Sequence, residues 1–233
     1  MNRIEKKYLA PNAITAANML LGYISITMSI KGNFTQAAWF IVLAMVCDGL
    51  DGQTARRLEA YSEFGKEFDS FCDAISFGLA PSILAYSLLN IYSNITHIII
   101  PISFIYALCG VMRLVKFNIV TTASDEKDDF SGMPIPTGAA IVCSYYLFSH
   151  YLFGKLVYVE IFQIVTIISA ILMVSTIPFK TPDKTFKFIP KKLRIPFFIV
   201  VIATIKYSLF VVTFTYVLIN LFQHMQNINS AEN

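Results

Sequence analysis

Charged residues are scarce in this chain of 233 residues. Asp, Glu, Lys and Arg make up 14% of it and hydrophobic residues 56%, whereas about a quarter of a soluble domain is charged. Two apolar stretches, residues 83–112 and 156–177, are each long enough to cross a bilayer, which takes about 20 helical residues. The composition therefore excludes an ordinary soluble domain.

Paired cysteines and repeats are also missing. The chain has four cysteines, each standing alone within an apolar run. Without paired spacing they indicate neither a zinc site nor a disulfide framework, and we expect buried free thiols. The N-terminus is charged but lacks a small-residue cleavage site, so we interpret it as a cytoplasmic lead-in rather than a removed signal peptide.

Continuous apolar runs are what the sequence has in abundance. They favour transmembrane helices over the short alternating segments of a β-barrel, and we predict an all-α integral membrane protein. The last run, with Lys206 in its middle, is either one tilted helix or two short ones broken near Lys206. Helices are expected at residues 12–30, 34–57, 66–90, 96–119, 134–152, 156–177 and 195–222.

Basic residues are unevenly distributed along this topology. With the N-terminus inside, 15 of the 18 Lys and Arg residues fall in cytoplasmic segments or at their helix ends, and six of them lie in residues 178–196. Cytoplasmic loops of membrane proteins carry such an excess. We therefore predict a multi-pass protein of the cell membrane with a cytoplasmic N-terminus. Residues 178–196 fit either attraction to anionic headgroups or plain topology determination.

Seven acidic residues gather in residues 47–73, between apolar neighbours. Asp48 and Asp51 are three apart on one predicted helix, and Asp69 and Asp73 are four apart on the next, so each pair shares a helix face. The short link makes these helices antiparallel neighbours, and we expect the carboxylates to converge near the cytoplasmic surface. Close carboxylates cannot all ionise without compensating charge. Carboxylates without His or Cys suit Mg²⁺, Mn²⁺ or Ca²⁺.

Small and basic residues accompany these acids. Gly52 and Ala55 follow Asp48 by one and two helical turns and would let a ligand approach the backbone closely. Arg56 offers a forked donor suited to phosphate. A single Asp at a helix end is often a cap or a salt-bridge partner, but this combination favours a binding site, because polar groups at membrane depth normally mark function.

The spacing of these residues resembles the signature of the CDP-alcohol phosphotransferase family. The stretch fits D-x₂-D-G-x₂-A-R-x₈-G-x₃-D-x₃-D at Asp48, Asp51, Gly52, Ala55, Arg56, Gly65, Asp69 and Asp73. The resemblance implies a six-helix transmembrane core in residues 1–180. Residues 181–233 would then add a basic cytoplasmic loop and one or two C-terminal transmembrane helices.

The resemblance also implies a reaction, in which an alcohol displaces CMP from a CDP-linked lipid. Mg²⁺ or Mn²⁺, with Ca²⁺ as a further option, would be held by Asp48, Asp51, Asp69 and Asp73. Asp73 would also be the catalytic base that deprotonates the acceptor hydroxyl. The CDP-lipid would be bound by Asp48, Gly52, Ala55, Arg56, Gly65 and Asp69. Phosphoryl transfer requires positioning and charge neutralisation, which metals supply.

The implied acceptor is L-serine. Family members with a phosphorylated acceptor typically have Arg where this chain has Asn18, and the stretches at residues 68–87, 110–119 and 130–140 resemble the phosphatidylserine synthase branch. Arg113, Lys116 and Asn118 are the implied acceptor-binding residues, and the fork of Arg113 matches a carboxylate. Ordinary positive-inside anchoring is the alternative for Arg113 and Lys116.

Three other functions remain open from the residues. Glycerol 3-phosphate or inositol phosphate as acceptor is disfavoured by Asn18. A cation transporter would more often place its carboxylates at the membrane midplane. A noncatalytic subunit would be expected to have lost part of the motif. The expected partners are CDP-diacylglycerol or a CDP-archaeol-type lipid, L-serine, the bilayer and a second copy in a homodimer, with no nucleic acid.

Overall fold

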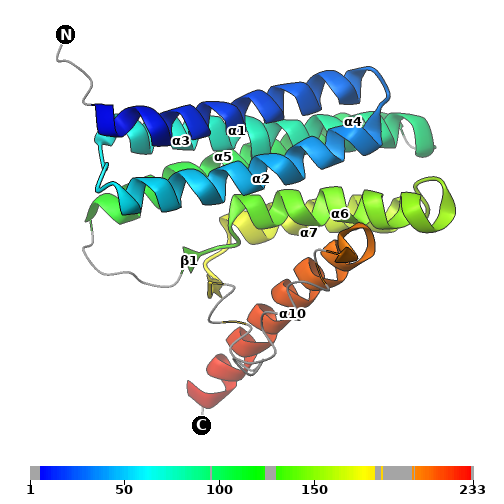
Figure 1. Cartoon of the computed structure of the whole chain (residues 1–233). Helices are drawn as coiled ribbons and strands as arrows, with labels where there is room; N and C mark the ends of the chain where they lie inside the picture. Colours follow the sequence, from blue (N-terminus) through cyan, green and yellow to red (C-terminus); the bar gives the residue numbers. More distant parts are fainter. Residues whose placement is uncertain are drawn as a thin grey trace.

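The computed structural model describes residues 6–94, 96–123, 130–181, 185, 201 and 203–231. They form a bundle of helices with one short pair of strands (Figure 1), so the predicted all-helical class is confirmed. The helices are α1 (Lys6–Ile30), α2 (Phe34–Arg57), α3 (Glu63–Asp73), α4 (Ala80–Tyr92), α5 (Ile99–Ala123), α6 (Ile135–Phe153), α7 (Val159–Val174) and α10 (Ile205–Ala231), with a short 3-10 turn, η2 (Thr96–Ile98), before α5.

Several of these helices can cross a membrane. In the described part of the chain, five spans are long and apolar enough: Lys7–Ile30, Phe34–Arg57, Glu63–Tyr92, Ile99–Ile119 and Ile205–Asn227. The helix α7 is apolar but shorter. Most of α6 is buried inside the bundle, including the polar Ser144 and Ser149. The chain is therefore an integral, multi-pass membrane protein.

The first and the last predicted helices depart most from the structure. We expected the first helix to begin after Pro11, but α1 begins at Lys6 and contains this proline. Pro11 lies in the second turn of α1, so the helix lacks one backbone hydrogen bond there. The last run was predicted as one tilted helix or as two helices broken near Lys206, and α10 begins at Ile205, where that break was placed. Residues 186–200 fall outside the described ranges, so the number of C-terminal spans remains a prediction.

The helix expected at residues 66–90 changes its winding partway. A π-helical turn, η1 (Ala74–Leu79), joins α3 to α4, and π turns often lie at functional sites. It follows directly after Asp73. Gly22 of α1 lets η1 come close, because a Cβ there would lie 2.7 Å from the Cα of Ser76. The Ser76 hydroxyl then donates to the carbonyl of Asn18 at 2.9 Å.

The two ends of the bundle are named here by their connections. The acidic end holds the link between α2 and α3, and the distal end holds the link between α1 and α2. At the acidic end, β1 (Phe130–Ser131) pairs antiparallel with β2 (Pro178–Phe179), which joins the start of α6 to the segment after α7. Gly132 turns the chain beside β1 with a φ of +84°, and a Cβ there would collide with the Met173 carbonyl.

The helix α10 lies obliquely across α6 and diverges from it toward the C-terminus (Figure 1). At the distal end its first turn meets the last turn of α6, where the rings of Tyr207 and Tyr151 lie 6.2 Å apart. Farther along, Phe210 contacts Tyr145 with a ring separation of 5.4 Å. The C-terminal half of α10 therefore returns to the acidic end, where Asn220 contacts Lys180.

Candidate active site

Three of the four predicted aspartates form one cluster. Asp48 and Asp51 project from the last turns of α2, and Asp69 projects from α3. One carboxylate oxygen from each lies within 4.8 Å of the others. The spacing of three residues places Asp48 and Asp51 on one face of α2, as the sequence predicted. Among the described residues, the two acidic helices are not packed directly on each other as expected: α1 packs against both α2 and α3 and so brings their carboxylates together.

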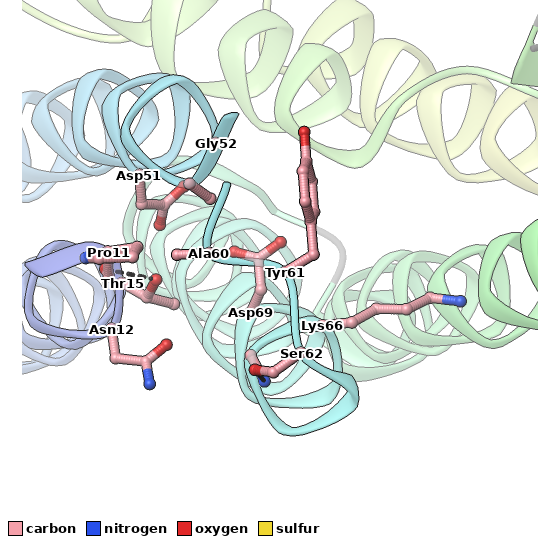
Figure 2. A pocket seen from close by; sticks show the side chains of 12 residues that line it. Pro11, Asn12, Thr15, Asp51, Gly52, Ala60, Tyr61, Ser62, Lys66 and Asp69 are labelled. Carbon is pink, nitrogen blue, oxygen red and sulfur yellow. Dashed lines mark hydrogen bonds between the residues drawn. The ribbon is translucent and has the colours of Figure 1, made fainter. Parts of the chain in front are cut away.

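A cavity of about 170 Å³ opens beside this cluster. Figure 2 shows the carboxylates of Asp51 and Asp69 facing the space between α2 and α3, with Thr15 of α1 at its edge. Gly52, Ala55 and Gly65, all predicted to contact a CDP-lipid, line the same cavity. Small side chains therefore leave room next to the acids.

Unpaired oxygens indicate that this site is built for a cation. Within the described residues, Asp51 Oδ2 and Asp69 Oδ1 are buried and have no hydrogen-bond partner. Burying a carboxylate oxygen without compensation is costly. Three converging carboxylates without a sulfur or imidazole ligand match the preference of hard divalent cations. The residues therefore fit a divalent metal.

Asp73 lies next to the cluster but has a different partner. Its Oδ1 accepts a hydrogen bond of 3.0 Å from the Asn18 side-chain amide. Asp73 as a whole residue is 8% exposed, and Asn18 is fully buried. Asp48 and Asp69 are electrostatic neighbours of Asp73, so this acid borders the metal cluster while α1 fixes its orientation.

The start of α3 is shaped by its N-cap. The Ser62 hydroxyl accepts a hydrogen bond of 3.0 Å from the backbone N–H of Gly65, which is a standard way to satisfy a free donor at a helix start. A Cβ on Gly65 would lie 3.0 Å from the Ser62 hydroxyl and 3.5 Å from Asn12 Oδ1. Glycine therefore keeps the cavity wall tight between α1 and α3.

Arg113 is brought to the acidic cluster from α5. Its side chain is 7% exposed, and it interacts electrostatically with Asp73 and Asp48. The guanidinium also lies over the Phe117 ring, 4.9 Å from its centroid. A buried arginine beside carboxylates is well placed to meet an anionic group of a substrate.

Lys116 and Asn118 make other contacts. Lys116 Nζ donates to Ser131 Oγ at 3.0 Å and to the Ser175 carbonyl at 3.4 Å. Asn118 Nδ2 donates to Ser70 Oγ at 3.0 Å, which ties α5 to α3. These residues therefore brace the surroundings of the site, and their role toward an acceptor remains a prediction.

Arg56 is exposed at the end of α2 and is not among the residues that line the cavity beside the cluster. Lys66, from α3, points out of the cavity (Figure 2) and donates to the Asn118 carbonyl at 3.3 Å. The expected phosphate contact of Arg56 therefore also remains a prediction.

Sequence reasoning missed two features of this site. From the sequence, Asn18 served only as evidence against a phosphorylated acceptor, because it stands where arginine would. In the structure it is the hydrogen-bond partner of Asp73. Tyr216 of α10 was not singled out, yet it is 5% exposed and its hydroxyl donates to the Lys180 carbonyl at 2.7 Å. A polar residue inside an apolar helix was the available signal in each case.

Comparison with known proteins gives a consistent result. The sequence profile of the family described as CDP-alcohol phosphatidyltransferase matches residues 8–179. The chain is 38% identical over 177 residues to the CDP-diacylglycerol–serine O-phosphatidyltransferase of Helicobacter pylori, covering 75% of this chain and 73% of that protein.

Two archaeal proteins are also similar. The CDP-diacylglycerol–serine O-phosphatidyltransferase of Methanocaldococcus jannaschii is 34% identical over 191 residues, covering 81% of this chain and 83% of that protein. The archaetidylserine synthase of Methanothermobacter thermautotrophicus is 38% identical over 144 residues, covering 60% of this chain and 59% of that protein.

Proposed function

This chain belongs to the CDP-alcohol phosphatidyltransferase family, and from that membership we propose that it transfers a phosphatidyl group from a CDP-lipid to the hydroxyl of L-serine. The products are a phosphatidylserine-type lipid and CMP. Relatives named for serine transfer, at 38% and 34% identity over most of their length, support serine as the acceptor.

One observation carries the chemistry. Asp51 and Asp69, each with an unpaired carboxylate oxygen, line the cavity. Asp73 is an electrostatic neighbour of this pair and is held by Asn18. This arrangement supports binding of a pyrophosphate–metal complex next to a separately oriented base. A divalent cation held by Asp48, Asp51 and Asp69, with Asp73 as a further ligand, would neutralise the charge that develops on the departing CMP.

Asp73 is proposed to act on the acceptor. It takes the proton from the serine hydroxyl, whose oxygen forms a bond to the phosphorus that carries the lipid. The bond from that phosphorus to CMP breaks, and CMP leaves with the bonding electrons. Asn18 holds Oδ1 of Asp73 and thereby directs the other carboxylate oxygen toward the acceptor.

Substrate contacts are assigned around this centre. Gly52, Ala55 and Gly65 form the close wall for the CDP group, and Arg56 is proposed to reach its phosphates from the surface. Arg113 is proposed to bind the serine carboxylate, which matches its forked donors. Lys116 and Asn118 belong to the same acceptor side, through the contacts that hold α5 in place.

The membrane arrangement follows from charge. The excess of basic residues at the acidic end supports a cytoplasmic N-terminus and active site. The first six predicted helices form the proposed transmembrane core, and α10 is an extension of it. A homodimer is expected from the family resemblance. The names of the relatives leave two donors, a CDP-diacylglycerol and a CDP-archaeol-type lipid.

CMP release tests the whole proposal. Purified protein in detergent would receive radiolabelled CDP-diacylglycerol or CDP-archaeol with Mg²⁺ or Mn²⁺, and L-serine, glycerol 3-phosphate and inositol phosphate would be compared as acceptors. We expect release with serine and its loss on addition of EDTA. Release only with a phosphorylated acceptor would overturn the serine assignment. Failure of both donors with every acceptor would overturn the enzymatic reading.

A further inference from the structure

The helix α3 supplies Asp69 to the metal cluster, whereas Asp48 and Asp51 come from α2. In the described part of the chain, α3 packs closely against α1 and against η1, which continues it, but not against α2. The distance between Asp69 and the other two acids therefore depends on what holds α3 on its remaining side. A pair of hydrogen-bonded side chains provides such a hold, and it leads to α5.

This hold is formed by Ser70 of α3 and Asn118 of α5, which are 48 residues apart. Asn118 Nδ2 donates to Ser70 Oγ at 3.0 Å. The Ser70 proton is shared between Asn118 Oδ1 at 3.3 Å and the Lys66 carbonyl at 3.2 Å. Lys66, one helical turn before Ser70, adds a bond of 3.3 Å from its Nζ to the Asn118 carbonyl. Two residues on one face of α3 therefore bond to a single residue of α5.

This face of α3 differs from the face that carries the acid. Ser70 directly follows Asp69, and successive residues of a helix point about 100° apart. Figure 2 shows the Asp69 carboxylate directed to the space between α2 and α3, while Lys66 points away from it. One face of α3 therefore presents the metal ligand, and the neighbouring face fixes the helix to α5.

The helix α5 is itself well fixed at this point. It packs against α4, α7 and η1. Two residues before Asn118, Lys116 Nζ donates to Ser131 Oγ at 3.0 Å and to the Ser175 carbonyl at 3.4 Å. These bonds join this part of α5 to β1 and to the residue that follows α7. A shift of α3 away from α5 would therefore have to break its bonds to Asn118.

We propose that Ser70 and Asn118 are positioning residues that fix α3 so that Asp69 can share one divalent cation with Asp48 and Asp51. This inference rests on the metal site of the proposed function and deepens it. It gives Asn118 a role toward the metal that differs from contact with the acceptor. Neither positioning residue needs to touch the cation, because the carboxylates are the ligands and the link to α5 sets their separation.

The test measures binding of Mn²⁺ directly, by electron paramagnetic resonance of the purified protein in detergent. In Ser70→Ala and in Asn118→Ala we expect the Kd for Mn²⁺ to rise about tenfold, the lower end of the effect of residues that orient metal ligands. Ser70→Thr keeps the hydroxyl and should stay within about twofold of wild type. Ser82→Ala is the matched control, because it removes a bond of 2.7 Å to the Ser103 carbonyl that joins α4 to α5 without involving α3.

A double-mutant cycle and turnover complete the test. Because both substitutions break the same link, Ser70→Ala combined with Asn118→Ala should bind Mn²⁺ no more weakly than Asn118→Ala alone. At saturating Mn²⁺ the KM for serine should stay within about twofold, whereas loss of a residue that binds the acceptor would raise it. Thermal unfolding in detergent shows whether each variant remains folded.

Each outcome decides the inference. Unchanged Mn²⁺ affinity in Ser70→Ala and Asn118→Ala, equal losses in Ser70→Ala and Ser70→Thr, or the same loss in Ser82→Ala would overturn it. A raised serine KM with unchanged Mn²⁺ affinity would assign Asn118 to the acceptor instead. Wild-type protein that binds Mn²⁺ but releases no CMP would overturn the proposed function, while the Mn²⁺ affinities of the variants would still decide this inference. Wild-type protein that binds no Mn²⁺, with or without CDP-diacylglycerol, would overturn the metal site and this inference together.

Discussion

The two ends of the bundle differ in whether their buried polar groups have hydrogen-bond partners. At the distal end, polar side chains pair with one another across helices: Trp39 Nε1 donates to the Tyr151 hydroxyl at 3.0 Å, and Gln163 donates to Ser93 at 3.0 Å. Ser29 is left without a partner among the described residues, but it is a neutral hydroxyl. At the acidic end, by contrast, carboxylate oxygens of Asp51 and Asp69 are left unpaired.

This difference distinguishes polar groups that stabilise the fold from polar groups that serve to bind a ligand. A paired polar group contributes about 1 kcal/mol to stability, whereas an unpaired buried charge costs far more. A protein retains such a cost only where a ligand compensates for it. Substitutions at the distal end are therefore expected to change stability without changing activity, whereas substitutions at the acidic end are expected to change activity.

The largest effect is expected from Asp73→Asn, because it removes the proposed base while keeping the size of the side chain. Loss of general base catalysis should lower kcat about a thousandfold, and binding of the CDP-lipid should persist. Single-turnover CMP release and equilibrium binding of CDP-diacylglycerol would be measured together. Turnover at the wild-type rate would remove Asp73 from the base role.

A second large effect is expected from Asp69→Asn, because one carboxylate of the metal cluster becomes neutral. We expect activity at fixed metal to fall about a hundredfold, with the midpoint of the Mg²⁺ or Mn²⁺ titration moved to higher concentration. Glu67→Gln, an exposed acid on the same helix, is the control. An unchanged metal titration in Asp69→Asn would contradict its role as a ligand.

The convergence of these acids was predictable because it depends on local spacing. Asp48 and Asp51 share a face on any helix, and a short link keeps the start of α3 at the same end of the bundle as the end of α2. The class of fold followed equally from the apolar runs. Each of these predictions needs only helical geometry and the length of a connection.

Other parts of the site depend on contacts that spacing does not encode. Asn18 and Asp73 are 55 residues apart, and their pairing requires α1 to pack on η1 through Gly22. The π turn after Asp73 has no marker in the composition of its residues. The burial of Tyr216 could not be predicted either, because an amphipathic tyrosine in an apolar helix fits lipid contact as well as burial.

A moderate effect is expected from Asn18→Ala. The variant removes the amide that holds Asp73 Oδ1 at 3.0 Å but leaves the three-carboxylate cluster intact. We expect kcat to fall about tenfold, as for the loss of one hydrogen bond to a charged group. The metal titration should be unchanged, and a shift in its midpoint would place Asn18 in metal binding instead.

Stability is also at stake in that variant, since Asn18 is fully buried. Ala17→Ser, at the preceding position of α1 and only half-buried, is a control for disturbance of the helix itself. Thermal unfolding in detergent would be recorded for both. Equal losses of activity in the two variants would assign the effect to α1 packing rather than to Asp73.

The smallest effect on catalysis is expected from Tyr151→Phe at the distal end. Removing the hydroxyl that accepts from Trp39 should lower the free energy of unfolding by about 1 kcal/mol, with kcat/KM within about twofold of wild type because the reacting groups lie at the other end. Trp39 is the one tryptophan of the chain, so its fluorescence reports on this end alone. Metal or CDP-lipid should leave its emission unchanged, and a shift on ligand binding would mean that the two ends are coupled.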